Sequence, residues 1–108
     1  MLSLVSENEI YGQSLNPFDY SRSTGGSSGG DASLVAAKCI PLSFGTDIAG
    51  SVRCPAEFTG IYGFKPTTTR VSSKNIIVPL PDGSAPQCIF AETTGPMGKT
   101  YKDMKIGV

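Results

Sequence analysis

The sequence predicts an α/β fold, and three observations support that prediction. Short apolar segments that suit strands alternate with short segments that suit helices, in the order loop, helix, strand, loop, helix, strand. Loops rich in glycine and serine separate these segments, and the chain contains 13 glycines and 8 prolines. The length of 108 residues is enough for one small domain, or for part of a larger one, with a modest core.

The first half of the chain is expected to hold one helix and one strand. Residues 1–24 are polar and rich in turn-forming residues. Asp31 precedes an alanine-rich segment and is expected to cap a helix over residues 32–38. The apolar run over residues 40–44 predicts a buried strand.

The second half repeats this order and then becomes irregular. Residues 52–58 are expected to form one or two helical turns, with a proline near the start. Residues 61–65 alternate large and small side chains and predict a strand. Prolines and an Asp-Gly pair predict irregular structure over residues 67–88. Residues 93–97 are expected to form a turn, and the strand-like end of the segment 102–108 closes the chain.

Composition excludes several classes of function. The chain contains no histidine, so it cannot build a Ser-His-Asp triad, a Cys-His pair or a histidine metal site of its own. Its net charge of zero gives no indication of a nucleic-acid partner. No apolar run reaches membrane-spanning length, and no signal peptide is recognisable. Three widely spaced cysteines indicate reduced thiols in a cytoplasmic protein without disulfides or bound metal: Cys39, Cys54 and Cys88.

Two loops of small residues carry the candidate catalytic serines. Ser27 lies in the first loop, Gly25–Gly30, and Ser51 ends the second, Gly45–Ser51. Both backbones are small enough for a substrate to approach closely. The consecutive amides of residues 48–51, ahead of a predicted helix, are expected to direct their N–H groups to one point, as an oxyanion hole requires. A serine nucleophile still needs a proton acceptor.

Taken singly, each loop is better explained as a glycine-rich turn with a backbone role only. A phosphate-binding loop is excluded because the lysine of its motif is absent. A nucleophile elbow is excluded because Ser51 lies in Ala-Gly-Ser-Val-Arg. Cys54 has no evident base and is expected to pack as a thiol. Asp47 and Arg53 are expected to brace the second loop, and Ser28 to form local hydrogen bonds.

In combination, the motifs resemble the amidase signature family. They occur in the family's order over about residues 10–100, and the spacing of the two serines agrees with the family pattern. The whole chain, residues 1–108, would then be an incomplete part of the mixed-sheet fold of that family, most similar to its fatty-acid amide hydrolase branch. The motifs are Asn16-Pro17, the two glycine-serine loops, Gly60-Ile-Tyr-Gly-Phe-Lys-Pro-Thr67 and Gly95-Pro-Met97.

The resemblance implies a mechanism that needs no histidine. A lysine, a serine in a cis peptide and a nucleophilic serine form the relay. By position, Ser51 would be the nucleophile that attacks a non-peptide amide, and Ser27 would be the bridging cis-serine. The oxyanion hole would consist of the N–H groups of Ile48, Ala49, Gly50 and Ser51. Ala49 stands where many members have glycine and keeps its N–H. No cofactor or metal is implied, and the expected partner is a small-molecule amide substrate.

The catalytic lysine that the resemblance implies has no counterpart in this sequence. In the family it lies well upstream of the first loop, whereas all six lysines here follow Ser27. Lys38 comes first among them, follows the first predicted helix and is expected to be solvated. It is therefore a poor replacement base, because a lysine that acts as a base needs burial to lower its pKa. We therefore expect a fragment that is inactive alone and has exposed sheet edges. The alternative is a non-catalytic remnant whose loops serve as a scaffold or a surface for a partner.

Three aromatic residues near the first loop leave two interpretations open. Tyr11, Phe18 and Tyr20 either form the floor of an acyl pocket or pack the first polar segment. Membrane association, oligomeric state and the particular amide are not indicated by the sequence.

Overall fold

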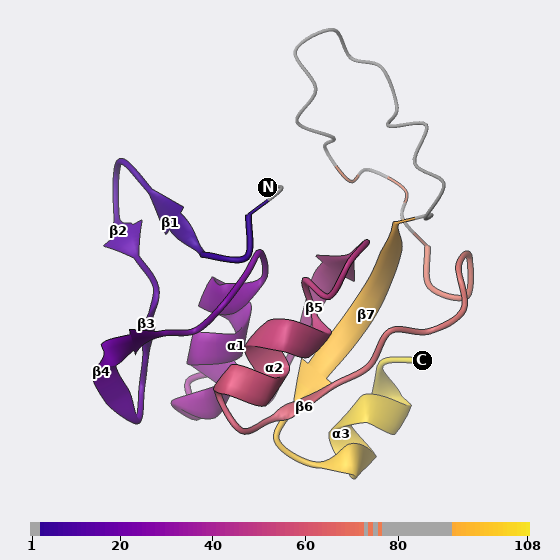
Figure 1. Cartoon of the computed structure of the whole chain (residues 1–108). Coiled ribbons are helices and arrows are strands. Elements are labelled where there is room, and N and C mark those ends of the chain that lie inside the picture. The colour runs from indigo at the N-terminus through magenta and orange to yellow at the C-terminus, as the bar shows by residue number, and fades with distance from the viewer. Residues whose placement is uncertain (1–2, 73, 75, 77–91) are drawn as a thin grey trace, which may run out of the picture.

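The computed structural model describes residues 3–72, 74, 76 and 92–108 (Figure 1). Two small hairpins precede a three-stranded sheet that helices cover on both faces. Among these residues the elements are β1 (Glu7–Asn8), β2 (Gly12–Gln13), β3 (Leu15–Asn16), β4 (Asp19–Ser23), α1 (Gly29–Ala36), β5 (Leu42–Asp47), α2 (Arg53–Phe58), β6 (Tyr62–Gly63), β7 (Thr93–Gly98) and α3 (Tyr101–Ile106).

The central sheet has the strand order β5-β7-β6, and both pairings are antiparallel. β7 pairs with β5 along its whole length, from Leu42 opposite Gly98 to Asp47 opposite Thr93. Strands 46 or more residues apart in the sequence are therefore neighbours at the point where β5 runs into the second glycine-serine loop. The observed architecture is a mixed α/β fold, as the sequence predicts.

Helices α1 and α2 pack together against one face of this sheet (Figure 1). The core between them consists of small and medium-sized apolar side chains around Met97 of β7: Ala32, Val35, Ala36, Val52, Ala56, Ile61 and Met97. α3 lies against the other face, where its Asp103 and Met104 side chains approach Gly98. The N-terminal ends of α1 and α2 are thereby held side by side, each preceded by one of the two loops.

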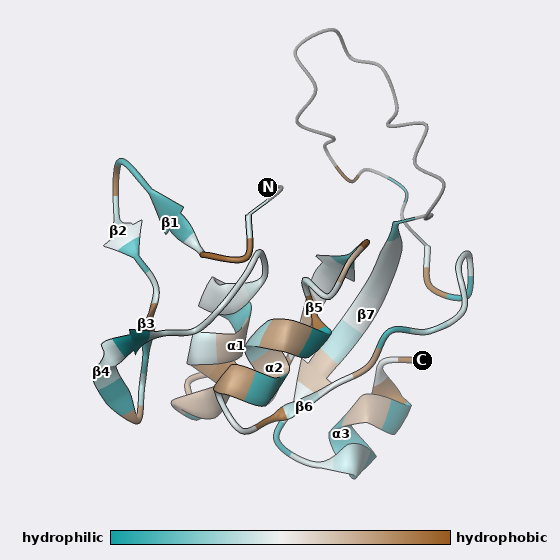
Figure 2. Ribbon diagram, viewed as in Figure 1, coloured by the Kyte–Doolittle hydropathy of each residue, from teal (hydrophilic) through white to brown (hydrophobic). Residues whose placement is uncertain are grey.

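Apolar side chains remain exposed on the sheet and on the helices. Phe44 of β5 is 46% exposed, and Tyr62, Phe64 and Ile106 are exposed as well. Figure 2 shows apolar residues along both α2 and α3. The prediction of a buried strand over residues 40–44 is wrong in burial and in bounds, because none of these residues is buried and the strand runs over Leu42–Asp47. The expected exposure of the sheet edges is confirmed at Phe44 and Tyr62. No helix in the described ranges is long and apolar enough to cross a membrane.

Helix α1 begins earlier than the sequence indicated. It starts at Gly29, inside the first loop, with Ser28 at the N-cap position. Asp31 is therefore not the cap but lies in the first turn, where its carboxylate accepts a hydrogen bond from the Ser43 hydroxyl of β5. The predicted helix and strand of the second half are confirmed as α2 and β6.

The expectations for the last elements were wrong. Residues 93–97, expected to be a turn, lie in the central strand β7, because pairing on both sides overrides the local Gly-Pro signal. The C-terminal segment is the helix α3 rather than a strand. Thr100 and Asp103 form a capping box at its start, with Asp103 N–H to Thr100 Oγ1 at 3.3 Å and Thr100 N–H to Asp103 Oδ2 at 2.7 Å.

Of the irregular stretch expected over residues 67–88, residues 73, 75 and 77–88 lie outside the described residues, as does Cys88. The described residues of that stretch belong to no helix or strand.

Candidate active site

The two glycine-serine loops meet through a backbone hydrogen bond. The Ser28 N–H donates to the Ser51 carbonyl oxygen at 3.1 Å. The peptide bond between Gly26 and Ser27 is cis, as the resemblance implies for this position. Ser27 and Ser51 are both half-buried and lie next to the starts of α1 and α2. The fold therefore brings together two serines that are 24 residues apart in the sequence.

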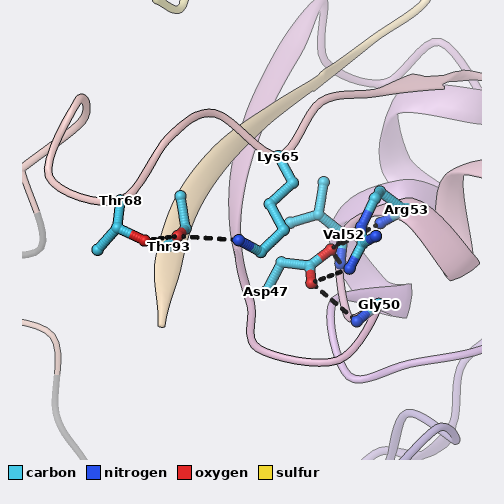
Figure 3. Close-up of polar contacts among 7 residues, drawn as sticks. All are labelled: Asp47, Gly50, Val52, Arg53, Lys65, Thr68 and Thr93. Carbon is cyan, nitrogen blue, oxygen red and sulfur yellow. Dashed lines mark hydrogen bonds and ion pairs between the residues drawn. The ribbon is translucent and has the colours of Figure 1, made fainter. Parts of the chain in front are cut away.

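The second loop is braced by a buried carboxylate. Asp47 is 0% exposed, and its two oxygens accept hydrogen bonds from the N–H groups of Gly50 at 2.8 Å, Val52 at 3.1 Å and Arg53 at 3.3 Å. The Arg53 guanidinium adds two more, from Nε at 3.0 Å and from Nη2 at 2.9 Å (Figure 3). The bracing role expected for Asp47 and Arg53 is therefore observed.

These contacts keep Asp47 ionised. Burial raises its pKa, but the hydrogen bonds from the Arg53 side chain and from three backbone N–H groups outweigh burial and lower the pKa to about 2. The same ion pair raises the pKa of Arg53. The loop that carries Ser51 is consequently built on a fixed negative charge at neutral pH.

The Asp47 contact changes the expected oxyanion hole. Because the Gly50 N–H donates to Asp47 Oδ1, it is engaged and does not point freely toward a substrate. The N–H groups of Ile48, Ala49 and Ser51 have no hydrogen-bond partner among the residues that the structure describes. The four consecutive donors expected from the sequence are therefore reduced to three candidates.

The first loop is braced by a side chain that the sequence did not single out. The Ser6 Oγ lies 3.0 Å from the Gly25 carbonyl oxygen and 2.9 Å from that of Ser27. It also accepts the Gly29 N–H at 2.8 Å. No pattern around Ser6 distinguishes it from other serines, because its partners are 19 to 23 residues away in the sequence.

Close packing explains the glycines of the first loop. A Cβ on Gly26 would lie 2.8 Å from the Val5 backbone nitrogen, and one on Gly29 would overlap the hydroxyl oxygens of Ser6 and Thr24. These positions are glycine because neighbouring segments approach the backbone closely. The loop is therefore a packed part of the fold and not a flexible linker.

The six lysines are either exposed or hydrogen-bonded to residues other than the candidate serines. Lys38 is exposed, as expected. The Lys65 Nζ donates to Thr93 Oγ1 at 3.3 Å, beside the Asp47 loop (Figure 3). The Lys99 Nζ donates to the Ala36 carbonyl at 3.0 Å and lies over the Phe18 ring. Among the described lysines, none forms a hydrogen bond with Ser27 or Ser51.

The remaining candidates have packing or surface roles. The Cys54 sulfur lies 3.4 Å from where a Cβ on Gly25 would stand, so this thiol packs beneath the first loop. Tyr11, Phe18 and Tyr20 are all exposed, so they do not form a buried floor in this structure.

The curated relatives include amidotransferase subunits and fatty-acid amide hydrolases. A glutamyl-tRNA(Gln) amidotransferase subunit of Methanospirillum hungatei is 50% identical over 76 residues, which cover 70% of this chain and 18% of the relative. Human fatty-acid amide hydrolase 2 is 44% identical over 101 residues, which cover 87% of this chain and 19% of the relative. The chain therefore spans less than a fifth of these relatives, and both kinds match at similar identity.

Comparison with solved structures places the same segment in larger enzymes. A fatty acid amide hydrolase structure superposes with a TM-score of 0.88 at 35% identity, covering 97% of this chain and 18% of that one. A 6-aminohexanoate cyclic dimer hydrolase complexed with substrate matches with a TM-score of 0.81 at 34% identity, covering 96% and 20%. The family model described as Amidase matches residues 1–107. With the motifs and the fold in agreement, the chain belongs to the amidase family.

Proposed function

We propose that this chain carries the nucleophile and its bridging serine for hydrolysis of a non-peptide amide bond. The observation that carries the proposal is the hydrogen bond from Ser28 N–H to the Ser51 carbonyl, which joins the two loops at 3.1 Å. Ser27, whose peptide bond with Gly26 is cis, directly precedes Ser28, which donates the N–H, and Ser51 provides the accepting carbonyl oxygen. An isolated glycine-rich turn would need no such partner loop.

The proposed reaction proceeds through an acyl-enzyme. The Ser51 Oγ attacks the amide carbonyl carbon, and its proton passes by way of Ser27 to the leaving nitrogen. The C–N bond breaks and the amine departs. Water then attacks the ester carbonyl and releases the acid. The N–H groups of Ile48, Ala49 and Ser51 are the proposed donors to the oxyanion, and no cofactor takes part in these steps.

The names of the relatives support the proposed substrate class. Relatives are named as amidotransferase subunits and as fatty-acid amide hydrolases, and a solved neighbour is named as a cyclic dimer hydrolase. Their shared chemistry is the carbon–nitrogen bond of an amide. We therefore propose a small-molecule amide as the substrate, with a lysine as the base, as the resemblance implies.

A second candidate is a non-catalytic remnant that uses the loops as a scaffold. The observation in its favour is that no lysine of the described residues forms a hydrogen bond with Ser27 or Ser51. Exposed Phe44 and Tyr62 on the central sheet also suit a surface that contacts a partner.

Labelling with a fluorophosphonate probe separates the two candidates. A nucleophile held beside oxyanion donors is expected to label slowly in the unmodified chain and not at all in Ser51→Ala. Ser21→Ala is the matched control, because the Ser21 hydroxyl lies in an exposed hairpin and, among the described residues, donates its hydrogen bond to Asp19. Labelling that is equal or absent in both the chain and Ser51→Ala would favour the remnant.

Turnover is a separate measurement. We expect no hydrolysis of a simple aryl amide by this chain alone, because no lysine of the described residues forms a hydrogen bond with Ser27 or Ser51. Hydrolysis that depends on Ser51 would overturn that expectation and would require a base among the lysines present.

A further inference from the structure

The Ser6 hydroxyl stands at the centre of the contacts behind the first loop. A hydroxyl has one proton to donate and two lone pairs that accept. Ser6 shares its proton between the carbonyl oxygens of Gly25 and Ser27, which flank the cis peptide on either side. A lone pair receives the Gly29 N–H at the start of α1. One side chain thus fixes three backbone groups of the loop.

Ser6 is itself held by neighbouring hydroxyl residues. Its carbonyl accepts the Ser14 N–H at 2.8 Å. The Ser14 carbonyl accepts the Thr24 hydroxyl at 3.1 Å, and Thr24 is fully buried directly before Gly25. Hydrogen bonds therefore connect Ser6 through Ser14 to Thr24, the residue directly before the first loop. The Ser6 hydroxyl is not a freely rotating surface group.

The backbone around Ser6 also lies against the loop. Gly26 approaches the backbone of Leu4 and Val5 so closely that a Cβ would lie 2.8 to 2.9 Å from their atoms. Residues 4–6 therefore lie directly against the first loop, with Leu4 and Val5 against Gly26 and Ser6 bonded on either side of it.

We infer that Ser6 is a positioning residue for the proposed relay, an inference that rests on the proposed function. Ser6 acts through the Ser27 backbone and touches no reacting atom. The Ser28 N–H that bonds to the Ser51 carbonyl immediately follows the Ser27 carbonyl that Ser6 holds. Loss of the Ser6 hydroxyl therefore makes the position of Ser27 relative to Ser51 less well defined, while both serine side chains remain.

The test compares three variants in the full chain. Ser6→Ala removes the hydroxyl, Ser6→Thr retains it, and Ser21→Ala removes an exposed hydroxyl elsewhere. Amide hydrogen exchange is measured at Ser28 and Gly29. In Ser6→Ala the Gly29 N–H loses its acceptor, and the Ser28 N–H keeps its acceptor but is less well positioned, so exchange at both amides is expected to be about tenfold faster. Ser6→Thr and Ser21→Ala are expected to match the unmodified chain.

Labelling of Ser51 by the fluorophosphonate probe provides a functional readout. We expect about a tenfold lower labelling rate in Ser6→Ala, with recovery in Ser6→Thr. Unchanged labelling in Ser6→Ala would overturn the inference. If the unmodified chain itself does not label, the proposed function fails, and the exchange of Ser28 and Gly29 decides whether Ser6 holds the loop.

A general folding effect is distinguishable from positioning. Positioning predicts that faster exchange stays near the two loops and leaves the β5–β7 ladder protected. Loss of protection throughout the sheet in Ser6→Ala would overturn the positioning role. Ser6→Thr and Ser6→Val are nearly equal in shape, and only the first carries a hydroxyl. Faster exchange of the loop amides in Ser6→Val than in Ser6→Thr would therefore assign the effect to the hydroxyl.

Discussion

The two glycine-serine loops are held by different chemistry. The Ser51 loop is fixed by a buried carboxylate, Asp47, whose five hydrogen-bond donors all lie within six residues along the chain. The Ser27 loop is fixed by the neutral hydroxyl of Ser6, whose partners lie 19 to 23 residues away. A charged local brace shows in the sequence as a compact motif and responds to pH. A neutral distant brace does neither.

The largest expected effect comes from removing the charged brace. Asp47→Ala leaves three N–H groups without their acceptor and the Arg53 guanidinium without its partner. We expect a loss of about 3 kcal/mol in the free energy of unfolding. Denaturant unfolding measures this loss. A change below about 1 kcal/mol would show that the loop does not depend on the carboxylate.

Adding a methyl group to the Ser27 loop is expected to have the next largest effect. In Gly26→Ala the new Cβ would lie 2.8 Å from the Val5 nitrogen, which is backbone and cannot rotate away. We expect a loss of about 2 kcal/mol. Gly30→Ala is the comparison variant, because a Cβ there would meet only the Ser14 Oγ at 3.6 Å, an ordinary van der Waals contact. Equal unfolding midpoints for the two variants would contradict tight packing at Gly26.

Acid is expected to weaken the Ser51 loop selectively. The pKa of Asp47 is lowered from 3.8 to about 2 in the folded chain. Ionised Asp47 therefore contributes stability that is fully present above about pH 4, and the contribution is lost as the pH falls from about 4 to about 2. Ionisation of Asp47 thereby contributes about 2 kcal/mol to the free energy of unfolding.

Unfolding at about pH 5 and at about pH 2.5 measures this contribution. Asp47→Asn, which cannot ionise, is expected to lose less stability over the same interval. An identical pH dependence in this variant and in the unmodified chain would assign the acid effect to other carboxylates.

The smallest effect is expected from the exposed half of the ion pair. The Arg53 side chain is 52% exposed, so solvent screens its charge. We expect Arg53→Ala to lower the free energy of unfolding by about 1 kcal/mol, less than Asp47→Ala, because the backbone N–H groups still satisfy the carboxylate. Thermal unfolding of both variants tests this order. A larger effect for Arg53→Ala would mean that the guanidinium is the principal brace.

The contrast between the loops also explains which predictions succeeded. The segments Asp47–Arg53 and Arg53–Phe58 depend on neighbours in sequence, and both the brace and the helix α2 were predicted. β7 and Ser6 depend on partners far away, so the local sequence predicts a turn over residues 93–97 and gives no sign of the role of Ser6. α3 is the exception, because its capping box is local but was overlooked beside the Ile-Gly-Val ending.

By itself, the sequence determined the α/β class, the family resemblance and the two loops that carry Ser27 and Ser51. These depend on residue order and short-range contacts. Only the tertiary structure decided that the loops meet through a hydrogen bond between Ser28 and Ser51. It also decided that the Gly50 N–H, expected in the oxyanion hole, donates to Asp47, and that the Ser6 hydroxyl bonds to the Ser27 carbonyl. The physical reason is that hydrogen bonds and close packing between distant segments leave no periodic or local signal in the chain.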